Sequence, residues 1–198
     1  MLILLFLCLQ PGDRIKGITR QILYMEVDIL LQTVVIEQVN SIEPYLDEMS
    51  DMLIQIVDAG ASIGFLPPLE YKEAVAYWEQ VVQPATLLYV AKINDVIAGT
   101  IQLHLCTKPN GDHRAEVAKL MVHLDYRRHG IARLLMEHVE QQARLSQRVL
   151  LVLDTRDGDP SNRLYQSLGY SHAGQIPNYA KSGTGSLDAT NLYYKNLV

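Results

Sequence analysis

The sequence predicts an α/β fold, and three consecutive segments carry this prediction. An apolar run of strand length at 117–123 is followed by a turn of small residues and by an amphipathic helical run that begins near Gly130. A second apolar run of strand length follows at 149–153. A strand, a turn, a helix and a strand in this order form one βαβ crossover, in which the two strands run parallel.

The segments that precede the crossover begin with a strand and a helix. A β-branched, leucine-rich segment at 27–39 suits the first strand. Ser41 can cap a helix that has Pro44 in its first turn, where a missing N–H costs little. The expected buried stripe of this helix comprises Leu46, Met49, Leu53 and Ile56. Gly60 and Gly64 bracket the loop that follows.

A second helix and a hairpin come next. The helical stripe that follows two consecutive prolines comprises Tyr71, Val75, Trp78 and Val82. The apolar segments 87–93 and 96–105 predict two strands joined at Asn94-Asp95, which is a tight-hairpin signal. A turn at 108–111 then leads into the strand at 114–123.

The crossover itself is well marked. Its helix has an apolar residue at every fourth position, and polar residues occupy the remaining faces. The stripe comprises Ile131, Leu135, Val139 and Ala143. The uninterrupted apolar run at 149–153 predicts a strand covered on both faces, and Asp154-Thr155 is interpreted as a polar turn after it. Two further strands are expected at 171–180 and 189–197, around a flexible segment at 182–186.

The turn between the first crossover strand and the helix can bind a phosphate group. Residues 127–132 read Arg-x-x-Gly-x-Ala. The first N–H groups of a helix have no intrahelical partners, and the helix dipole adds partial positive charge there. Gly130 and Ala132 keep this turn open to a pyrophosphate. The P-loop and dinucleotide-binding fingerprints do not occur in the chain.

This turn resembles the acyl-CoA pyrophosphate loop of the GNAT family of acyl-CoA N-acyltransferases. Residues 162–170 resemble a second signature of that family, Asn-x-x-Leu-Tyr-x-x-x-Gly-[Phe/Tyr], with Gly169 at the helix C-cap. A narrower likeness, to the tabtoxin-resistance acetyltransferase branch, covers roughly residues 40 to 196. Its segments are 60–65, 106–111, 114–122 and 153–155. The resemblance implies a mixed, bent sheet flanked by helices, with acetyl-CoA as co-substrate.

The resemblance also implies how acetyl-CoA is held, between the strands near residues 120 and 150. The backbone of 120–122 would pair with the pantetheine amides as though they were an added strand. Asn162 would hydrogen-bond the pantetheine, although it can instead cap its helix. Arg127 and Arg128 would add charge at the phosphates, although they can instead be a solvated pair. The expected acetyl-CoA-binding residues are Leu120, Met121, Val122, Arg127, Arg128, His129, Gly130, Ile131, Ala132, Asn162 and Tyr165.

Three residues are candidates for catalysis. Transfer to an amine needs the neutral amine as nucleophile, so a carboxylate near the acceptor would assist. Glu116 matches a position that the family often uses as base, and Asp154 stands where the next strand leaves the sheet. Glu116 can instead pair with Arg114 or Lys119, and Asp154 can cap a turn, so the choice stays open. Tyr165 would donate to the departing CoA thiolate, or else cover the edge of the core.

Length, charge and cysteine content limit the domain organisation and the kinds of partner that the chain can have. The chain has 198 residues, of which 48% are hydrophobic, so we expect one N-acetyltransferase domain at 25–198 and an extension outside the fold at 1–24. A net charge of −5 with scattered basic residues argues against a nucleic-acid partner. The apolar start at 1–9 is shorter than the ~20 residues that span a bilayer, so we expect no stable membrane association. Cys8 and Cys106 show no disulfide or metal spacing, which favours the cytoplasm and no metal.

The expected activity is direct acetyl transfer from acetyl-CoA to a small amine or hydroxyl acceptor. The branch-level likeness implies an amino-acid-like compound or a toxin as that acceptor, and hence a role in resistance. Acetylation of a polyamine or of a protein N-terminus is an alternative. A non-catalytic acyl-CoA-binding module is another, and a homodimer also stays open.

Overall fold

The computed structural model describes residues 33–197. The expected extension at 1–24 and the first part of the expected strand at 27–39 lie outside the described residues. The remainder of that segment forms strand β1, Val35–Gln38.

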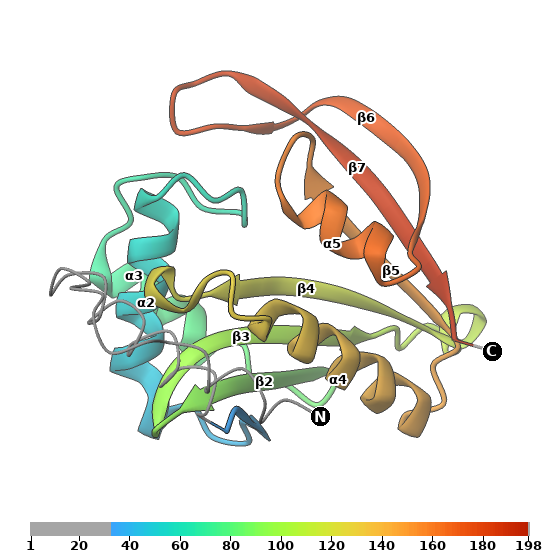
Figure 1. Ribbon diagram of the computed structural model, residues 1–198, viewed down its shortest axis with the longest axis horizontal. Coiled ribbons are helices and arrows are strands. Elements are labelled where there is room, and N and C mark those ends of the chain that lie inside the picture. The colour runs from blue at the N-terminus through green and yellow to red at the C-terminus, as the bar shows by residue number, and fades with distance from the viewer. Residues whose placement is uncertain (1–32, 198) are drawn as a thin grey trace, which may run out of the picture. The chain divides into compact units, whose positions relative to one another are not determined.

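Seven strands form one sheet in the order β1-β2-β3-β4-β5-β7-β6 (Figure 1). The strands after β1 are β2 (Thr86–Ile93), β3 (Val96–Leu105), β4 (Arg114–Val122), β5 (Leu150–Arg156), β6 (Ser171–Lys181) and β7 (Leu187–Asn196). Neighbouring strands are antiparallel except β4 and β5, which run parallel. The mixed sheet with a βαβ crossover is therefore confirmed.

Helices cover both faces of the sheet. The helical elements are η1 (Glu43–Tyr45), α2 (Leu46–Asp58), α3 (Tyr71–Glu79), η2 (Pro109–Gly111), η3 (Leu124–Tyr126), α4 (Ile131–Leu145) and α5 (Ser161–Ser167). Helices α2 and α3 share one buried cluster with the sheet, and α4 shares a second cluster on the other face. Figure 1 shows α4 lying across β2, β3 and β4. All four residues of the predicted α4 stripe are buried, which confirms it.

Four local expectations were wrong. Ser41 does not cap α2, because its hydroxyl donates to the Glu43 carboxylate and a 3₁₀ turn precedes the helix. Asp154 and Thr155 belong to β5 rather than to a turn, since β7 pairs with them. Alternate residues of β5 are only half-buried, so the strand is not fully covered on both faces. Tyr71 is 45% exposed, and its hydroxyl donates to Asp47 instead of packing in the core.

Trp78 anchors the core beneath α2 and α3. Its side chain is fully buried, and its indole N–H donates to the Met49 carbonyl at 3.0 Å. We expect Trp78→Ala to lower the free energy of unfolding by about 3–5 kcal/mol, because it leaves a large cavity. Tyr71→Phe, which removes one exposed hydrogen bond, should change it by less than about 1 kcal/mol. Urea denaturation measures both, and equal effects would contradict this picture of the core.

Strands β4 and β5 diverge soon after they begin. They pair only where Arg114–Glu116 lie beside Leu150–Val152. Beyond that point β4 continues along β3, and β5 continues along β7. Figure 1 shows the two strands running apart from a common end. Because no described strand takes up the β5-facing edge of β4 at 117–122, its backbone groups are available to a ligand.

A β-bulge interrupts β4 next to this opening. Thr100 pairs with Met121 and Gln102 with Ala118, so two residues of β4 face one residue of β3. The bulge contains Lys119, whose φ of +51° lies in the left-handed region. Ala115 and Val117 pack in the α4 cluster before the bulge, whereas Met121 packs in the α2–α3 cluster after it. The bulge thus switches the faces that the β4 side chains occupy.

Candidate active site

A pocket of about 360 Å³ lies where β4 and β5 diverge. Its walls come from five parts of the chain, namely β4, β5, α5, the loop after α2, and the β6–β7 hairpin. The polar side chains in these walls belong to Ser62, Glu116, Lys119, Asp154, Thr155, Arg156, Asp159, Ser161, Tyr165, Tyr179 and Thr190. The pocket therefore contains the three candidate catalytic residues of the sequence.

The two candidate carboxylates leave the sheet on the same face. Glu116 on β4 lies beside Val152 on β5, and Asp154 stands two residues farther along β5. Neighbouring positions in paired strands, and positions i and i+2 in one strand, share a face. Glu116 forms no ion pair with Arg114 or Lys119 within 4 Å, and Asp154 accepts a hydrogen bond from the Thr190 hydroxyl at 2.9 Å.

Tyr165 projects from α5 into the pocket. Only 6% of the residue is exposed, and its ring lies 5.9 Å from the rings of both Tyr170 and Tyr193. Burial raises the pKa of Tyr165, and the charges of Asp154 and Asp159 raise it further. The hydroxyl therefore stays protonated at neutral pH. A ligand in the pocket can accept from it.

Asn162, one turn before Tyr165, is occupied by hydrogen bonds within the protein. Its amide N–H groups donate to the carbonyls of Arg156 and Asp159, both at 2.9 Å. Its side-chain oxygen accepts from the Asn191 amide at 2.9 Å and from the Tyr193 hydroxyl at 3.0 Å. These bonds fix α5 against β5 and β7. The cofactor contact that the sequence predicts for Asn162 stays a prediction.

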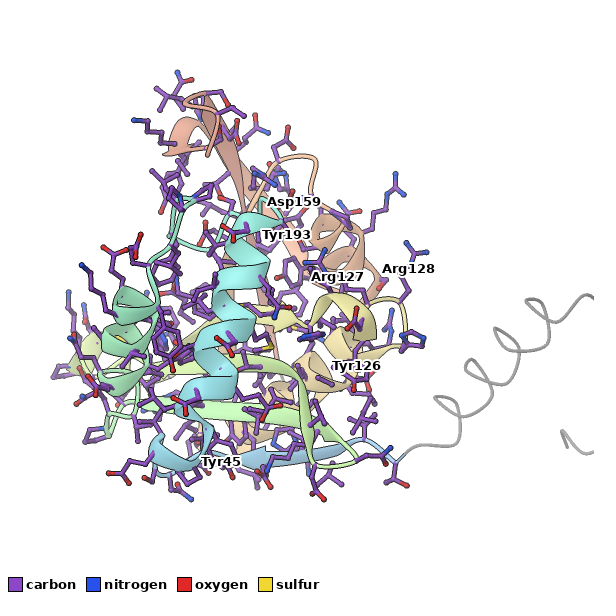
Figure 2. All side chains as sticks on the ribbon, turned by 90° about the vertical axis from the view of Figure 1, so that its left-hand side faces the viewer. Tyr45, Tyr126, Arg127, Arg128, Asp159 and Tyr193 are labelled. Carbon is purple, nitrogen blue, oxygen red and sulfur yellow. The ribbon has the colours of Figure 1, made fainter. Side chains whose placement is uncertain are left out.

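The predicted phosphate-binding turn is open and exposed. Gly130 is the N-cap of α4 with φ of +81°, and a Cβ placed on it would meet no atom within 4 Å. The first backbone hydrogen bond of α4 runs from the Leu134 N–H to the Gly130 carbonyl. The N–H groups before Leu134 are thus unused, as at any helix start. Arg127, Arg128 and His129 are exposed, and Figure 2 shows Arg128 projecting outward from the molecule.

The segment 120–122 joins the pocket to that turn. Met121 is 2% exposed and packs in the α2–α3 cluster, whereas Leu120 and Val122 are half-buried against the α4 cluster. Ile131 is buried and Ala132 is half-buried at the start of α4. These side chains therefore serve the core. Their predicted use of backbone groups toward pantetheine stays a prediction.

Several polar residues of the pocket were not predicted from the sequence, among them Arg156, Thr190 and Lys119. Arg156 is bound to Asp159 at 2.8 Å and to Asp188 at 3.6 Å. Thr190 is buried and holds Asp154. For Lys119 the sequence suggests only an ion pair with Glu116. If the expected strand is extended through Asp154 and Thr155, its alternation places Arg156 on the same face as Asp154. For Thr190, no pattern in the neighbouring sequence indicates a contact with Asp154.

No group of three or more His, Cys, Asp or Glu side chains among residues 33–197 lies close enough to hold a metal ion. No helix in the same residues combines the length and apolar character that crossing a membrane requires.

The chain belongs to the acetyltransferase (GNAT) family, whose sequence model matches residues 51–170. It is also similar to an uncharacterized N-acetyltransferase in the hisH–hisA intergenic region of Azospirillum brasilense. The two are 35% identical over 118 residues, which cover 57% of this chain and 68% of the relative. The family identity thus rests on sequence as well as on the fold.

Solved structures share the fold at low sequence identity. An N-acetyltransferase from Staphylococcus aureus Mu50 superposes with a TM-score of 0.73 at 17% identity, over 84% of this chain and 99% of the other. The putative acetyltransferase yncA from Salmonella typhimurium, solved with its cofactor acetyl-CoA, gives 0.70 at 17% identity, over 83% and 94%. These likenesses confirm the GNAT fold that the sequence predicts.

Proposed function

We propose that this protein transfers an acetyl group from acetyl-CoA directly to a small amine acceptor. One observation carries the proposal: Glu116, Asp154 and Tyr165 line a single pocket at the divergence of β4 and β5. Two groups that can hold a proton and one that can donate one therefore meet at the same place. Membership of the acetyltransferase family supports this assignment.

The surface beside the pocket suits acetyl-CoA. The β5-facing edge of β4 offers backbone groups to the pantetheine amides, and the turn at 127–130 offers N–H groups and positive charge to the pyrophosphate. Gly130 leaves space for a phosphate to approach the backbone. Acetyl-CoA supplies the activated acetyl thioester. The residues of this chain bind it, orient it and manage the protons.

Proton transfer falls to the residues in the pocket. An alkyl amine with a pKa of about 10 must lose a proton, at about 4 kcal/mol near neutral pH, before it can attack. Glu116 or Asp154 would accept that proton, directly or through water. As the thioester bond breaks, the Tyr165 hydroxyl would donate to the thiolate sulfur, which stabilises the developing negative charge.

The acceptor that we propose is a small amino-acid-like compound or a toxin. The likeness to the tabtoxin-resistance branch supports this choice over a polyamine or a protein N-terminus, and it would make the enzyme a resistance factor. A pocket of about 360 Å³ has the size of a small-molecule site. The absence of disulfide spacing between Cys8 and Cys106 favours a reducing compartment, so we place the enzyme in the cytoplasm.

A screen of acceptors tests the activity. Purified protein is mixed with acetyl-CoA and a library of small amines, and free CoA is detected with a thiol reagent. We expect amine-dependent release of CoA, with the acetylated amine identified by mass spectrometry. Binding of acetyl-CoA without acetyl transfer to any amine would favour a non-catalytic acyl-CoA-binding module instead.

Gly130→Asp should weaken acetyl-CoA binding at least tenfold, about 1.4 kcal/mol. The change places a side chain and a negative charge where we expect the pyrophosphate. Calorimetric titration measures the affinity. Glu137→Asp, on an exposed position of α4, is the control that should leave the affinity unchanged. Because Gly130 has a left-handed φ, thermal melting must first show that the variant is folded. An unchanged affinity for acetyl-CoA would show that this turn does not bind the pyrophosphate.

A further inference from the structure

Lys119 places an ammonium group in the wall of the pocket. Strict alternation along β4 would put residue 119 on the same buried face as Val117, where a charged group is costly. The bulge and the left-handed φ of Lys119 break that alternation. Bulges beside active sites commonly redirect a side chain in this way. As a result, Lys119 lines the same pocket as Glu116 and Asp154.

The Lys119 ammonium has N–H groups that can still donate to a ligand. Its Nζ donates to the Ile63 carbonyl at 2.6 Å, and it lies 5.6 Å and 6.0 Å from the ring centroids of Phe65 and Tyr77. No carboxylate among the described residues lies within 4 Å of it. Since an ammonium has three N–H groups, two remain for another acceptor. Burial lowers the pKa of Lys119, as expected for a cation that lacks an anionic partner.

The other cation of the pocket is already neutralised. Arg156 is bound to Asp159 and Asp188, and it also donates to the Gly60 carbonyl at 3.1 Å. Among the described residues that line the pocket, the charges left for an acceptor are therefore the two carboxylates Glu116 and Asp154 and the ammonium of Lys119. Two negative groups and one positive group in one pocket complement a ligand that carries both an amine and an anionic group.

We propose that Lys119 binds a carboxylate of the acetyl acceptor and so selects acceptors that carry an acid besides the reacting amine. This inference rests on the proposed function. A charge-assisted hydrogen bond from Lys119 to that carboxylate would hold the acceptor with its amine toward Glu116 and Asp154. Lys119 is thus a specificity residue that contacts the acceptor but takes no part in the proton transfers.

The test compares amino acids with their carboxamides in wild type and in Lys119→Met. In each pair the acid and the amide differ in the carboxylate and in the pKa of the amine. The second difference is the same for both proteins, so the change in the ratio of kcat/KM values between them isolates recognition of the carboxylate. We expect Lys119→Met to lower this acid-to-amide ratio by about 10- to 100-fold, mainly through a higher KM for the acid. Lys181→Met is the matched control, because Lys181 is exposed on β6 and outside this pocket.

Lys119 could affect the reaction by recognising the carboxylate of the acceptor or by holding the loop that contains Ile63 in place. A binding measurement distinguishes these two roles. Each acid and amide is titrated by calorimetry into the protein saturated with CoA. Weaker binding of the acid alone supports the proposal, whereas equal loss for acid and amide, or an unchanged ratio, overturns it. If wild type acetylates amines but none of these acids, the role of Lys119 is wrong and the acetyltransferase function stands. If no amine of any kind is acetylated, the proposed function fails as well.

Discussion

Replacing Tyr165 with phenylalanine should lower kcat by roughly 10- to 10³-fold while acetyl-CoA affinity stays unchanged. The substitution keeps the ring, which packs between Tyr170 and Tyr193, and removes one hydroxyl. Because the volume of the buried ring is kept, we expect the fold to lose little stability. The reaction, in contrast, loses the group that we expect to stabilise the departing thiolate.

The pH dependence of this effect follows from burial. Because the pKa of Tyr165 is raised, the hydroxyl is protonated throughout the range of an ordinary assay. The loss of kcat in Tyr165→Phe should therefore be the same from about pH 6 to about pH 9. Single-turnover kinetics, in which chemistry is observed directly, measure it. Tyr170→Phe, which removes a buried hydroxyl outside the pocket, is the control. Full kcat in Tyr165→Phe would show that solvent or backbone stabilises the thiolate instead.

Replacing Glu116 with glutamine should lower kcat/KM for an alkyl amine by roughly 10²- to 10⁴-fold, the range for loss of a general base. Glutamine keeps the size of the side chain and cannot accept the ammonium proton. We favour Glu116 because its carboxylate has no hydrogen-bond partner in the described part of the chain. Asp154, in contrast, already accepts from Thr190. Asp154→Asn should therefore have the smaller effect.

The pH–rate profile distinguishes the base from the bystander. Loss of the true base removes the acidic limb of the kcat/KM profile, because no protonation of that residue remains to stop the reaction. Loss of the other carboxylate leaves the limb in place. Glu137→Gln removes a carboxylate from an exposed position of α4 and controls for net charge. A normal acidic limb in Glu116→Gln, with the limb absent in Asp154→Asn, would exchange the two assignments.

The crossover was predictable because its signals are local. The apolar repeat of α4 has the helical period, and every residue of the predicted stripe, from Ile131 to Ala143, is buried. The hairpin at Asn94-Asp95 was equally local, and both residues have the positive φ that a tight turn requires. Local patterns thus predicted the elements that position the candidate phosphate-binding turn.

Long-range pairing explains the errors. The strand β5 continues through Asp154 and Thr155 because β7, more than thirty residues later, supplies hydrogen bonds to their backbone. Two polar residues in sequence look like a turn when that partner is unseen. The face occupied by Lys119 was equally hidden, since a bulge has no reliable sequence pattern and alternation alone predicts the wrong side.

The candidate site was predictable in part. The two family signatures led to Tyr165, and their context led to Glu116 and Asp154, which the structure places in one pocket. Thr190 was not predicted, because its contact with Asp154 joins segments that are distant in sequence. Arg156 was not predicted, because β5 was expected to end before it. The bonds of Asn162 within the protein hold α5 in place, and its predicted contact with pantetheine stays a prediction.

Amide hydrogen exchange with and without acetyl-CoA tests most directly whether the cofactor binds along β4 and on the turn before α4. We predict slower exchange in two segments, 117–122 and 128–133, because pantetheine would pair with the first and pyrophosphate with the N–H groups of the second. Exchange in α2, on the opposite face from α4, should not change. Acetyl-CoA binding that leaves both segments unprotected would contradict the assignment of this site.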